Sequence, residues 1–599
     1  MPFTAPPAFT TRPDLTGTFG MTASTHWLAT ATGQAVLERG GNAFDAAVAA
    51  AFVLHVVEPH LNGPGGDLAA ILATAEEPGT PVVLMGQGPA PAGASIDRFR
   101  AEGLEMVPGA GALAAAVPGA VDAWLLLLEA RGTWEARDVL AFAVGYARDG
   151  HPLTPAVARS IASMAGFFLE HWPTSAALWL HADGTPPAPG ELVQNPAWAA
   201  VLDELVAAGD ALGPEASRAD RVRAVRDAWA TGRVAQQIDA FVRTPHRHSS
   251  GTDHAGVIRA SDLAGFRASF ESATTGTFRG TTIAKTGPWG QGPVLLEMLA
   301  ILEPLPDEAL DPSTALGAHT AAEAIKLAMA DREASFGDTD VPLAALLAPE
   351  AIAARRALIG DRASHELRPA LGSLDALPSL RTAEEYVAGV GGVGEPTALS
   401  TGDLRGDTCH LDVVDRWGNI VAATPSGGWL QSSPTIPGLG FCLGTRLQMT
   451  WLDERSPSAL RPGRRPRTTL TPTLLLRDDR AVGALGSPGG DQQDQWQLLY
   501  LLRTLVGGWS PQQAIDAPAF HTTSFPGSFW PRTWEPGGLV VEDDLGDDVI
   551  RELEARGHVV TRAGARTLGR LSTVGRDPAT GVVHAAANAR AMQGYAAGR

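Results

Sequence analysis

The chain has 599 residues, of which 45% are hydrophobic and 19% are charged, and its formal net charge is -19 at pH 7. This charge argues against nucleic acid or an anionic membrane as the main partner. The sequence opens with no basic, apolar leader and contains no apolar run long enough to span a bilayer, so we expect a cytoplasmic protein. Cys409 and Cys442 are the two cysteines of the sequence, which excludes a disulfide framework.

The first part of the chain predicts helices layered on a sheet. A short strand is expected over 21–24, followed by a helix that ends at a glycine pair and by a nearly all-apolar, buried helix. Paired strands come next, and the chain from about 117 to 235 is mostly helical. The expected helices are 28–39, 43–56, 120–130, 136–148, 155–169, 196–208, 216–230, 294–302, 318–332 and 344–359, and the expected strands are 69–72, 81–85 and 275–283. This order indicates a layered α/β fold.

Residues 388–407 form the most linker-like stretch of the interior. Its glycines at 389–394 match a dinucleotide-binding spacing, but Glu395 and Pro396 follow where that motif needs a helix, so a linker is favoured. Beyond it the pattern changes to strands and turns, with hairpins over 408–424 and 468–486 and a helix over 491–506.

Several candidate sites have ordinary interpretations. His246, His248 and His254 lie close in sequence, but their Ser, Gly and Thr neighbours favour a solvated loop over a metal site. No Gly-x-Ser-x-Gly elbow is present. Cys409 shares one face of its strand with Leu411 and Val413, so we expect a buried small side chain rather than a nucleophile. We therefore expect neither a metal nor a cofactor.

The hairpin that starts at Thr408 carries a sharper hypothesis. Alternation places Thr408, His410 and Asp412 on one face of a strand. If the chain cuts itself between Asp407 and Thr408, the new α-amino group, with a pKa of about 7.7–8.0, can act as a base for the Thr408 hydroxyl. Backbone N–H groups at Gly489 and Gly490 could stabilise the oxyanion. The alternative is an ordinary hairpin and a tight turn.

These motifs resemble the gamma-glutamyltranspeptidase family. The matches run from about Gly20 to Gln593, and they comprise Gly40–Ala49, Val57–His60, Val117–Gly119, Ala330–Arg332, Thr408–His410, Arg465–Thr473 and Gly486–Gly490. The resemblance implies a four-layer αββα sandwich of the N-terminal nucleophile hydrolase type. It also implies a precursor cut into a large subunit, 1–407 with a flexible linker at 388–407, and a small catalytic subunit, 408–599. Thr408 would be the nucleophile, Ser426 a hydroxyl that assists it, and Gly489 with Gly490 the oxyanion hole.

The resemblance fails where the family binds its glutamyl group. Gln87 stands where the family has an arginine, and Gly428 where it has an asparagine. Thr450 and Trp451 replace an acidic pair, and a one-residue slip of that match is open. Thr468 and Thr469 replace a Ser-Ser pair. Losing a bidentate Arg–carboxylate contact removes strong recognition, so a different acyl group is expected.

Other side chains that follow the nucleophile could line its pocket, and the candidates are Trp429, Arg446, Gln448 and Trp451. Arg446 could meet a carboxylate and the tryptophans could cover a compact group. The equally weighted alternative is that the tryptophans only pack and that Arg446 lies on the surface.

These features predict an autoprocessed hydrolase of a small amide, similar to the oxamate-hydrolysing branch. Three alternatives stay open, namely a gamma-glutamyltransferase, a C–C bond hydrolase of a biosynthetic pathway, and an uncleaved binding protein. An oligomer of the cleaved heterodimer is compatible with the sequence.

Overall fold

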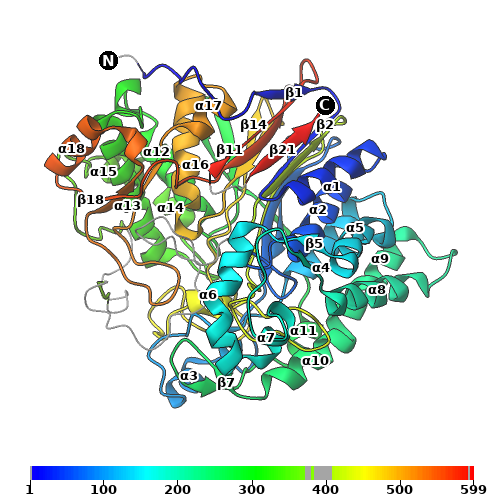
Figure 1. Cartoon of the computed structure of the whole chain (residues 1–599). Helices are drawn as coiled ribbons and strands as arrows, with labels where there is room; N and C mark the ends of the chain where they lie inside the picture. The colour runs from blue at the N-terminus through cyan, green and yellow to red at the C-terminus, as the bar shows by residue number, and fades with distance from the viewer. Residues whose placement is uncertain (1–2, 371–379, 383–407, 591–593) are drawn as a thin grey trace.

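The structure is a computed structural model that describes residues 3–370, 380–382, 408–590 and 594–599. Two seven-stranded antiparallel sheets lie face to face at its centre, and helices cover their outer faces (Figure 1). In the first sheet the strand order is β21 (Tyr595–Gly598), β2 (Gly20–Ser24), β12 (Leu411–Asp415), β13 (Ile420–Ser426), β3 (Asp67–Ala73), β4 (Val82–Gly86) and β9 (Ser269–Ser272). In the second it is β1 (Leu15–Gly17), β20 (Val583–Ala587), β19 (Ser572–Arg576), β15 (Arg480–Gly486), β14 (Thr473–Arg477), β11 (Thr281–Lys285) and β10 (Thr274–Phe278).

One helical layer covers the first sheet. It is built on α1 (Trp27–Glu38), α2 (Ala43–Val57) and α4 (Ala120–Arg131), with α5 (Ala136–Asp149), α8 (Pro196–Asp210) and α9 (Arg218–Thr231) outside them. Every residue of α2 is buried, as its continuous apolar sequence predicts. A capping box between Asn42 and Asp45 satisfies the first N–H groups of this helix, so it can start inside the protein.

The second helical layer covers the other sheet and completes the four-layer αββα sandwich. Its main helices are α12 (Gly292–Leu302), α13 (Ala315–Ser335) and α16 (Gln493–Leu501). Around it lie α17 (Pro511–Asp516), α18 (Asp547–Ala555) and a small sheet of β16 (Phe520–Thr522), β17 (Gly538–Val541) and β18 (Val559–Arg562). In Figure 1 this layer is drawn mostly in green and orange, and the first layer in blue to cyan. The expected fold class is therefore confirmed.

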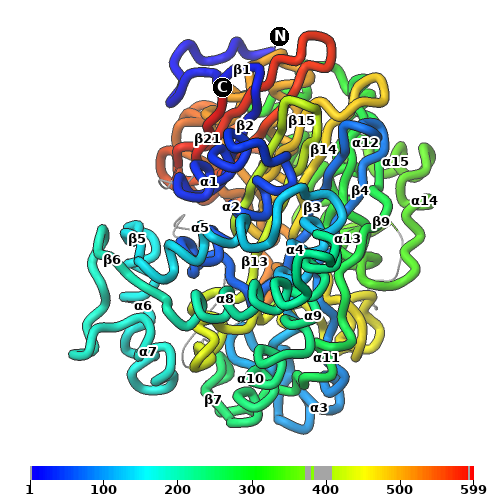
Figure 2. The backbone as a smooth tube through the Cα atoms, turned by 90° about the vertical axis from the view of Figure 1, so that its right-hand side faces the viewer, coloured from blue at the N-terminus to red at the C-terminus, as the bar shows by residue number. Residues whose placement is uncertain are grey.

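The remaining elements lie at the periphery. Figure 2 shows α6 (Pro155–His171) and α7 (Pro173–Trp179) beside the short strands β5 (His151–Pro152) and β6 (Leu192–Val193), away from the two sheets. Three further helices, α3 (Ile96–Ala101), α10 (Arg233–Val242) and α11 (Ala260–Gly265), are found with the short pair β7 (His246–Arg247) and β8 (Asp253–His254) at one end of the molecule. In the part of the chain that the structure describes, no helix is both long and apolar enough to cross a membrane.

Four predicted elements differ from the observed ones. The strand expected over 275–283 is the hairpin of β10 (Thr274–Phe278) and β11 (Thr281–Lys285), because Arg279 and Gly280 have positive φ angles and turn the chain. The helix expected over 344–359 is two helices, α14 (Leu343–Leu346) and α15 (Pro349–Arg356), because Pro349 lacks an N–H group and starts a new helix. The strand expected over 468–476 starts only at Thr473, after Pro472. The helix expected over 491–506 is a 3₁₀ turn (Gly490–Gln492), α16 and a π-helical turn (Leu502–Val506).

The chain on either side of residue 407 contributes to both sheets. In the first sheet β2 lies between β21 and β12, so a strand from the N-terminal range separates two from the C-terminal range. In the second sheet β14 pairs with β11 and β20 pairs with β1. The linker and Asp407 lie outside the described residues. The predicted division at Asp407 and Thr408 stays a prediction.

Candidate active site

Thr408 lies at the open end of the hairpin β12–β13. It bridges Ser426 across the hairpin, and the Cys409 N–H donates to the Pro425 carbonyl at 3.0 Å. The hydroxyl groups of Thr408 and Ser426 are 3.0 Å apart, which is hydrogen-bonding distance. Thr408 is only 2% exposed. The nucleophile predicted from the sequence and the hydroxyl predicted to assist it are therefore in direct contact.

A row of hydrogen-bonded polar groups continues from Thr408 along β12. His410 Nδ1 is 2.9 Å from Thr424 Oγ1, and His410 Nε2 is 2.8 Å from Asp412 Oδ1. The Ser572 hydroxyl in β19 donates to Asp412 Oδ2 at 2.8 Å. Burial raises the pKa of Asp412, although the His410 and Ser572 contacts oppose that effect. The row connects the two sheets behind Thr408, and the predicted alternation along this strand is confirmed.

The opposite face of the same strand is packed into the core. Cys409 is fully buried, as expected, and its thiol donates to Glu58 Oε2 at 3.0 Å. Asn62 Nδ2 lies 3.1 Å from the same sulfur, and the Thr25 hydroxyl donates to Glu58 Oε2 at 2.5 Å. These contacts hold the start of the hairpin from behind, so the Thr408 side chain is fixed on the face that meets the second sheet.

Gly489 and Gly490 form the turn that leads into α16. Their φ angles are +120° and +53°, in the region that favours glycine. A Cβ atom would lie 2.4 Å from the Trp496 ring at Gly489 and 2.8 Å from the Phe529 ring at Gly490. Gln291 Nε2 donates to the Gly490 carbonyl at 3.5 Å. Both positions require glycine, and the turn is enclosed by aromatic side chains.

Two of the predicted pocket residues use their polar groups inside the protein. Arg446 makes a bidentate ion pair with Asp67, both contacts being 2.6 Å, and the pair is buried. Trp429 Nε1 donates to the Leu61 carbonyl at 2.7 Å, and the Arg446 guanidinium lies 5.5 Å from the Trp429 ring centroid. The carboxylate that Arg446 was predicted to meet is therefore supplied by Asp67, at the start of β3.

Gly428 and Gln87 are buried at the ends of neighbouring segments. Gly428 has φ +67°, and a Cβ there would lie 2.9 Å from the Gly66 nitrogen. Gln87 follows β4, and its Nε2 donates to the Gly88 carbonyl at 3.2 Å. Its Oε1 has no hydrogen-bond partner among the described residues. Gln87 also lines a cavity of about 610 Å³ together with Arg465 and other residues.

Thr468 and Thr469 precede β14 in an irregular segment. Thr468 Oγ1 accepts a hydrogen bond from the Leu470 N–H at 3.2 Å. Thr469 Oγ1 is buried and has no hydrogen-bond partner among the described residues. The irregular course has a local cause, because the Thr471 N–H donates to Gln493 Oε1 at 3.3 Å instead of to a neighbouring strand.

A segment that the sequence did not single out, Phe525–Trp534, covers several predicted positions. The Trp530 N–H donates to Gln448 Oε1 at 3.2 Å. Arg532 Nη1 donates to the Thr450 carbonyl at 3.0 Å, and its guanidinium lies 3.5 Å from the Trp451 ring centroid. The segment has no helical or strand periodicity, so no sequence pattern could have placed it here.

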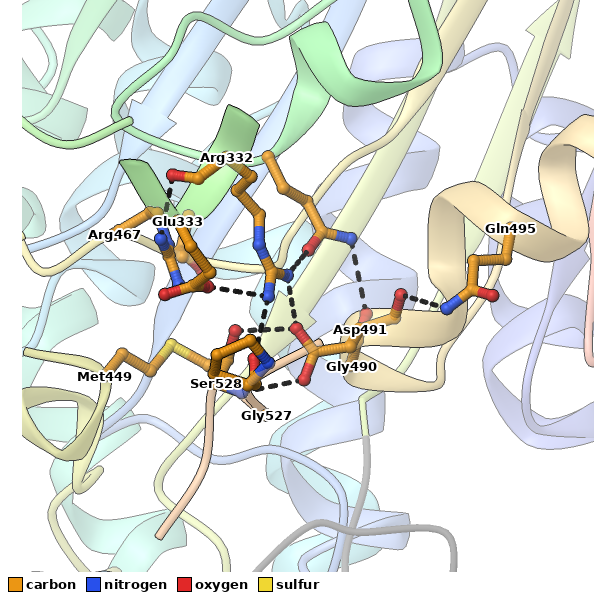
Figure 3. Close-up of polar contacts among 12 residues, drawn as sticks. Arg332, Glu333, Met449, Arg467, Gly490, Asp491, Gln495, Gly527 and Ser528 are labelled. Carbon is orange, nitrogen blue, oxygen red and sulfur yellow. Dashed lines mark hydrogen bonds and ion pairs between the residues drawn. The ribbon is translucent and has the colours of Figure 1, made fainter. Parts of the chain in front are cut away.

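Buried charges gather beside this segment (Figure 3). Arg332 pairs with Glu333 at 2.9 Å and with Asp491, and Arg467 pairs with Glu333 at 2.5 Å. Asp491 also accepts hydrogen bonds from the Ser528 N–H and hydroxyl at 2.8 and 2.6 Å. Burial alone would raise the pKa of Glu333, but the adjacent guanidinium groups lower it. These contacts attach the helix α13, which ends with Arg332–Ser335, to the residue that follows Gly490.

Among the described residues one group has the spacing of metal ligands: His319, Glu323 and His558. His319 Nδ1 lies 2.9 Å from His558 Nε2, so the two rings hydrogen-bond to each other. Glu323 is already paired with Lys326 at 2.5 Å and with Arg368 at 2.9 Å. Two adjacent cations disfavour a metal ion at this carboxylate.

The histidines of the 246–254 stretch are not in the solvated loop that we predicted. His248 and His254 are buried, and His246 is half-buried, around the short pair β7–β8. His254 Nδ1 contacts Glu102 Oε2 at 2.8 Å, and its Nε2 contacts Thr252 Oγ1 at 2.7 Å. Packing against α3 and Gly111 encloses these rings, which composition alone did not reveal.

Comparison with known proteins agrees with this geometry. The family model described as gamma-glutamyltranspeptidase matches residues 29–598. The chain belongs to the gamma-glutamyltranspeptidase family. It is therefore an enzyme with the N-terminal nucleophile hydrolase fold.

Several known proteins resemble the chain over nearly its whole length. The acylase ACY 1 proenzyme of Pseudomonas sp. (strain SE83) is 30% identical, covering 94% of this chain and 90% of its own. The oxamate amidohydrolase proenzyme of Klebsiella pneumoniae is 29% identical, covering 97% and 98%. The solved structure of LmbA2991HD is 51% identical with a TM-score of 0.91, covering 99% and 100%. The cephalosporin acylase from Bacillus halodurans is 26% identical with a TM-score of 0.80, covering 99% and 98%.

Proposed function

We propose that the chain is a precursor that cleaves its own peptide bond between Asp407 and Thr408 and then hydrolyses a small amide through an acyl-enzyme on Thr408. The observation that carries the proposal is the 3.0 Å contact between the Thr408 and Ser426 hydroxyls at the buried end of the hairpin. The relatives named proenzymes support a precursor, and the family supports the N-terminal nucleophile mechanism.

In the proposed reaction Thr408 Oγ1 attacks the amide carbonyl, and its proton passes to the α-amino group that cleavage creates. Ser426 keeps the hydroxyl oriented through their hydrogen bond. N–H groups at Gly489 and Gly490 stabilise the oxyanion, because φ angles open to glycine let the backbone approach the substrate. The C–N bond breaks, the amine leaves with a proton, and water then hydrolyses the Thr408 ester.

Intact-mass measurement of the purified protein tests the cleavage step. We expect wild type to separate into 1–407 and 408–599, and Thr408→Ala to stay whole because it lacks the attacking oxygen. Thr408→Ser keeps a hydroxyl and should cleave. A matched control is Thr231→Ala, which removes an exposed threonine that is distant in sequence from Thr408, and this variant should cleave like wild type. A wild type that stays whole after prolonged incubation contradicts the proposal.

The acyl group is proposed to differ from a standard gamma-glutamyl group. The support is that Gln87, Thr450 and Trp451 stand where the resemblance places the groups that bind the charged ends of glutamate. A second support is that one relative is named for the hydrolysis of oxamate. The experiment is to offer gamma-glutamyl-4-nitroanilide to the cleaved enzyme with and without glycylglycine. Slow turnover without transfer to the dipeptide is expected. Efficient transfer would establish a gamma-glutamyltransferase instead.

A further inference from the structure

The segment Phe525–Trp534 connects the predicted oxyanion turn to a buried cluster of charge. Phe529 lies where a Cβ on Gly490 would touch it, and its ring centroid is 6.4 Å from that of Trp429. Three residues further on, Arg532 contacts Thr450 and Trp451. A single short segment therefore lies against both Gly490 and two of the predicted pocket positions.

The cluster around Arg532 carries an excess of positive charge. Its guanidinium groups belong to Arg332, Arg467 and Arg532, and its carboxylates belong to Glu333 and Asp491. All five side chains are at least nine-tenths buried. Three cations face two anions, so among the described residues one positive charge is left without a counter-ion. An uncompensated buried charge is costly, and proteins keep one where a ligand completes it.

Arg532 is the member whose charge is least satisfied. Its Nε and Nη1 donate to the neutral carbonyls of Gly527 and Thr450 at 3.3 and 3.0 Å, and its Nη2 has no hydrogen-bond partner among the described residues. The nearest carboxylate oxygen, Glu333 Oε2, is 3.9 Å from Nη2 and also lacks a hydrogen bond. Burial lowers the pKa of Arg532 to about 9, so the group is still charged at neutral pH. The Trp451 ring covers one face of the guanidinium, so Nη2 is the donor that a ligand could use.

We propose that Arg532 binds a carboxylate of the substrate, so that the amide hydrolysed at Thr408 belongs to an anionic molecule. This inference rests on the proposed function and adds a substrate class to it. A carboxylate oxygen can accept a charge-assisted hydrogen bond from Nη2, and its negative charge neutralises the excess charge of the cluster. The carboxylate can belong to the acyl group or to the leaving amine, and the two are separated by the choice of substrates.

Paired substrates measure the effect of charge alone. Glutaryl-4-nitroanilide and pentanoyl-4-nitroanilide differ by a carboxylate in the acyl group, and pentanoyl-4-aminobenzoate and pentanoyl anilide differ by one in the leaving amine. We expect kcat/KM to favour the anionic member of one pair by about 10- to 100-fold, the range of a charge-assisted hydrogen bond. Equal kcat/KM values within both pairs overturn the proposal.

Arg532→Met should remove this preference, mainly through KM, and leave turnover of the neutral member within about threefold of wild type. Arg532→Lys keeps the charge without the planar edge and should retain part of the preference. The control Arg461→Met deletes an exposed cation nearby and should leave the preference unchanged. A purely structural role would instead lower turnover of both members equally in Arg532→Met, which contradicts the proposal.

Binding without turnover separates this inference from the proposed function. Calorimetry with glutarate and with neutral glutaramide needs no cleavage of an amide. We expect glutarate to bind wild type about tenfold or more tightly than glutaramide, and Arg532→Met to bind the two alike. Tighter glutarate binding in a protein that turns over no amide would retain the carboxylate site and reject the hydrolase. Equal binding of the two ligands to wild type overturns the carboxylate site whatever the enzyme hydrolyses.

Discussion

The hairpin β12–β13 and the segment Phe525–Trp534 differ in how their polar groups are satisfied. In the hairpin Thr408 has Ser426, and His410 has Thr424 and Asp412, all within 3.0 Å. In the segment Arg532 donates to two neutral carbonyls, those of Gly527 and Thr450, and its Nη2 is left over. A saturated region is suited to hold a reacting group still, whereas an unsaturated one is suited to receive a ligand. This difference fits the proposals that the hairpin carries the chemistry and that the segment selects the substrate.

The largest expected effect on stability comes from Arg446, and Arg532 is the buried arginine to compare it with. Arg446→Met leaves the Asp67 carboxylate buried and unpaired, so we expect a loss of about 3–5 kcal/mol in the free energy of unfolding. Arg532→Met leaves equal numbers of charges in its cluster and should cost only about 1–2 kcal/mol, for its contacts with the Gly527 and Thr450 carbonyls and with Trp451. Denaturant unfolding compares them, and Asp67→Asn should partly rescue Arg446→Met. Equal losses in the free energy of unfolding for the two variants would contradict the distinction between a paired and an unpaired arginine.

A smaller effect is expected where the second sheet meets the polar row of the hairpin. A Cβ at Gly486 would lie 2.2 Å from His410 Cε1, so Gly486→Ala should cost about 1–3 kcal/mol and slow the appearance of fragment 408–599. Gly483→Ala on the same strand is the matched control, since its Cβ would meet Leu475 at an ordinary 3.4 Å. Unfolding midpoints and a cleavage time course measure both. If Gly486→Ala behaves like Gly483→Ala, the row is not tightly packed.

Ser426→Ala tests whether the contact with Thr408 contributes to reactivity. We expect a stability loss of about 0.5–1.5 kcal/mol and slower cleavage, because the Thr408 hydroxyl loses its hydrogen bond. Ser433→Ala also removes a buried hydroxyl, which donates to the Leu443 carbonyl at 3.0 Å, and should lose stability without slowing cleavage. Fragment accumulation at equal temperature separates the two variants. Equal cleavage rates in the two variants would show that Ser426 contributes to stability but not to the reactivity of Thr408.

The smallest expected effect concerns the thiols. Burial raises the pKa of Cys442 to about 12, and its thiol donates to the Trp429 carbonyl at 2.9 Å. Cys409 is fully buried behind Thr408. Neither should react with iodoacetamide at pH 8 in the folded protein, and both should react after unfolding, because the thiolate is the reactive form. Mass spectrometry counts the adducts. Rapid labelling of folded Cys409 would mean that the hairpin opens readily.

The sequence predicted the hairpin better than the residues around it. Alternation along 408–414 and glycines at 489 and 490 are local patterns, so they could be interpreted without knowing which segments meet. The pairing of Arg446 with Asp67 joins residues 379 positions apart, and that of Asp412 with Ser572 joins residues 160 apart. Nothing near either residue encodes its partner. The fold class followed from the family motifs and the order of elements.

Arg532 was missed for a different reason. It lies in a stretch without periodicity, has φ +58°, and is buried among charges that come from α13, from the turn before α16 and from the segment before β14. Composition predicts an exposed arginine there, because arginine is seldom buried. Only the surplus of charge in the assembled cluster reveals it. Unmatched buried polar atoms of this kind are visible in three dimensions alone.

The interleaved strand order has a consequence for the timing of the proposed cleavage. Because β2 lies between β21 and β12, neither 1–407 nor 408–599 contains a complete copy of the first sheet. Each piece produced alone would present unpaired strand edges, which promote aggregation. The bond before Thr408 should therefore break only after the whole chain has folded, and the two products should then unfold together in one transition. In the proposed cleavage, Thr408 would become a chain terminus inside a scaffold that is already closed.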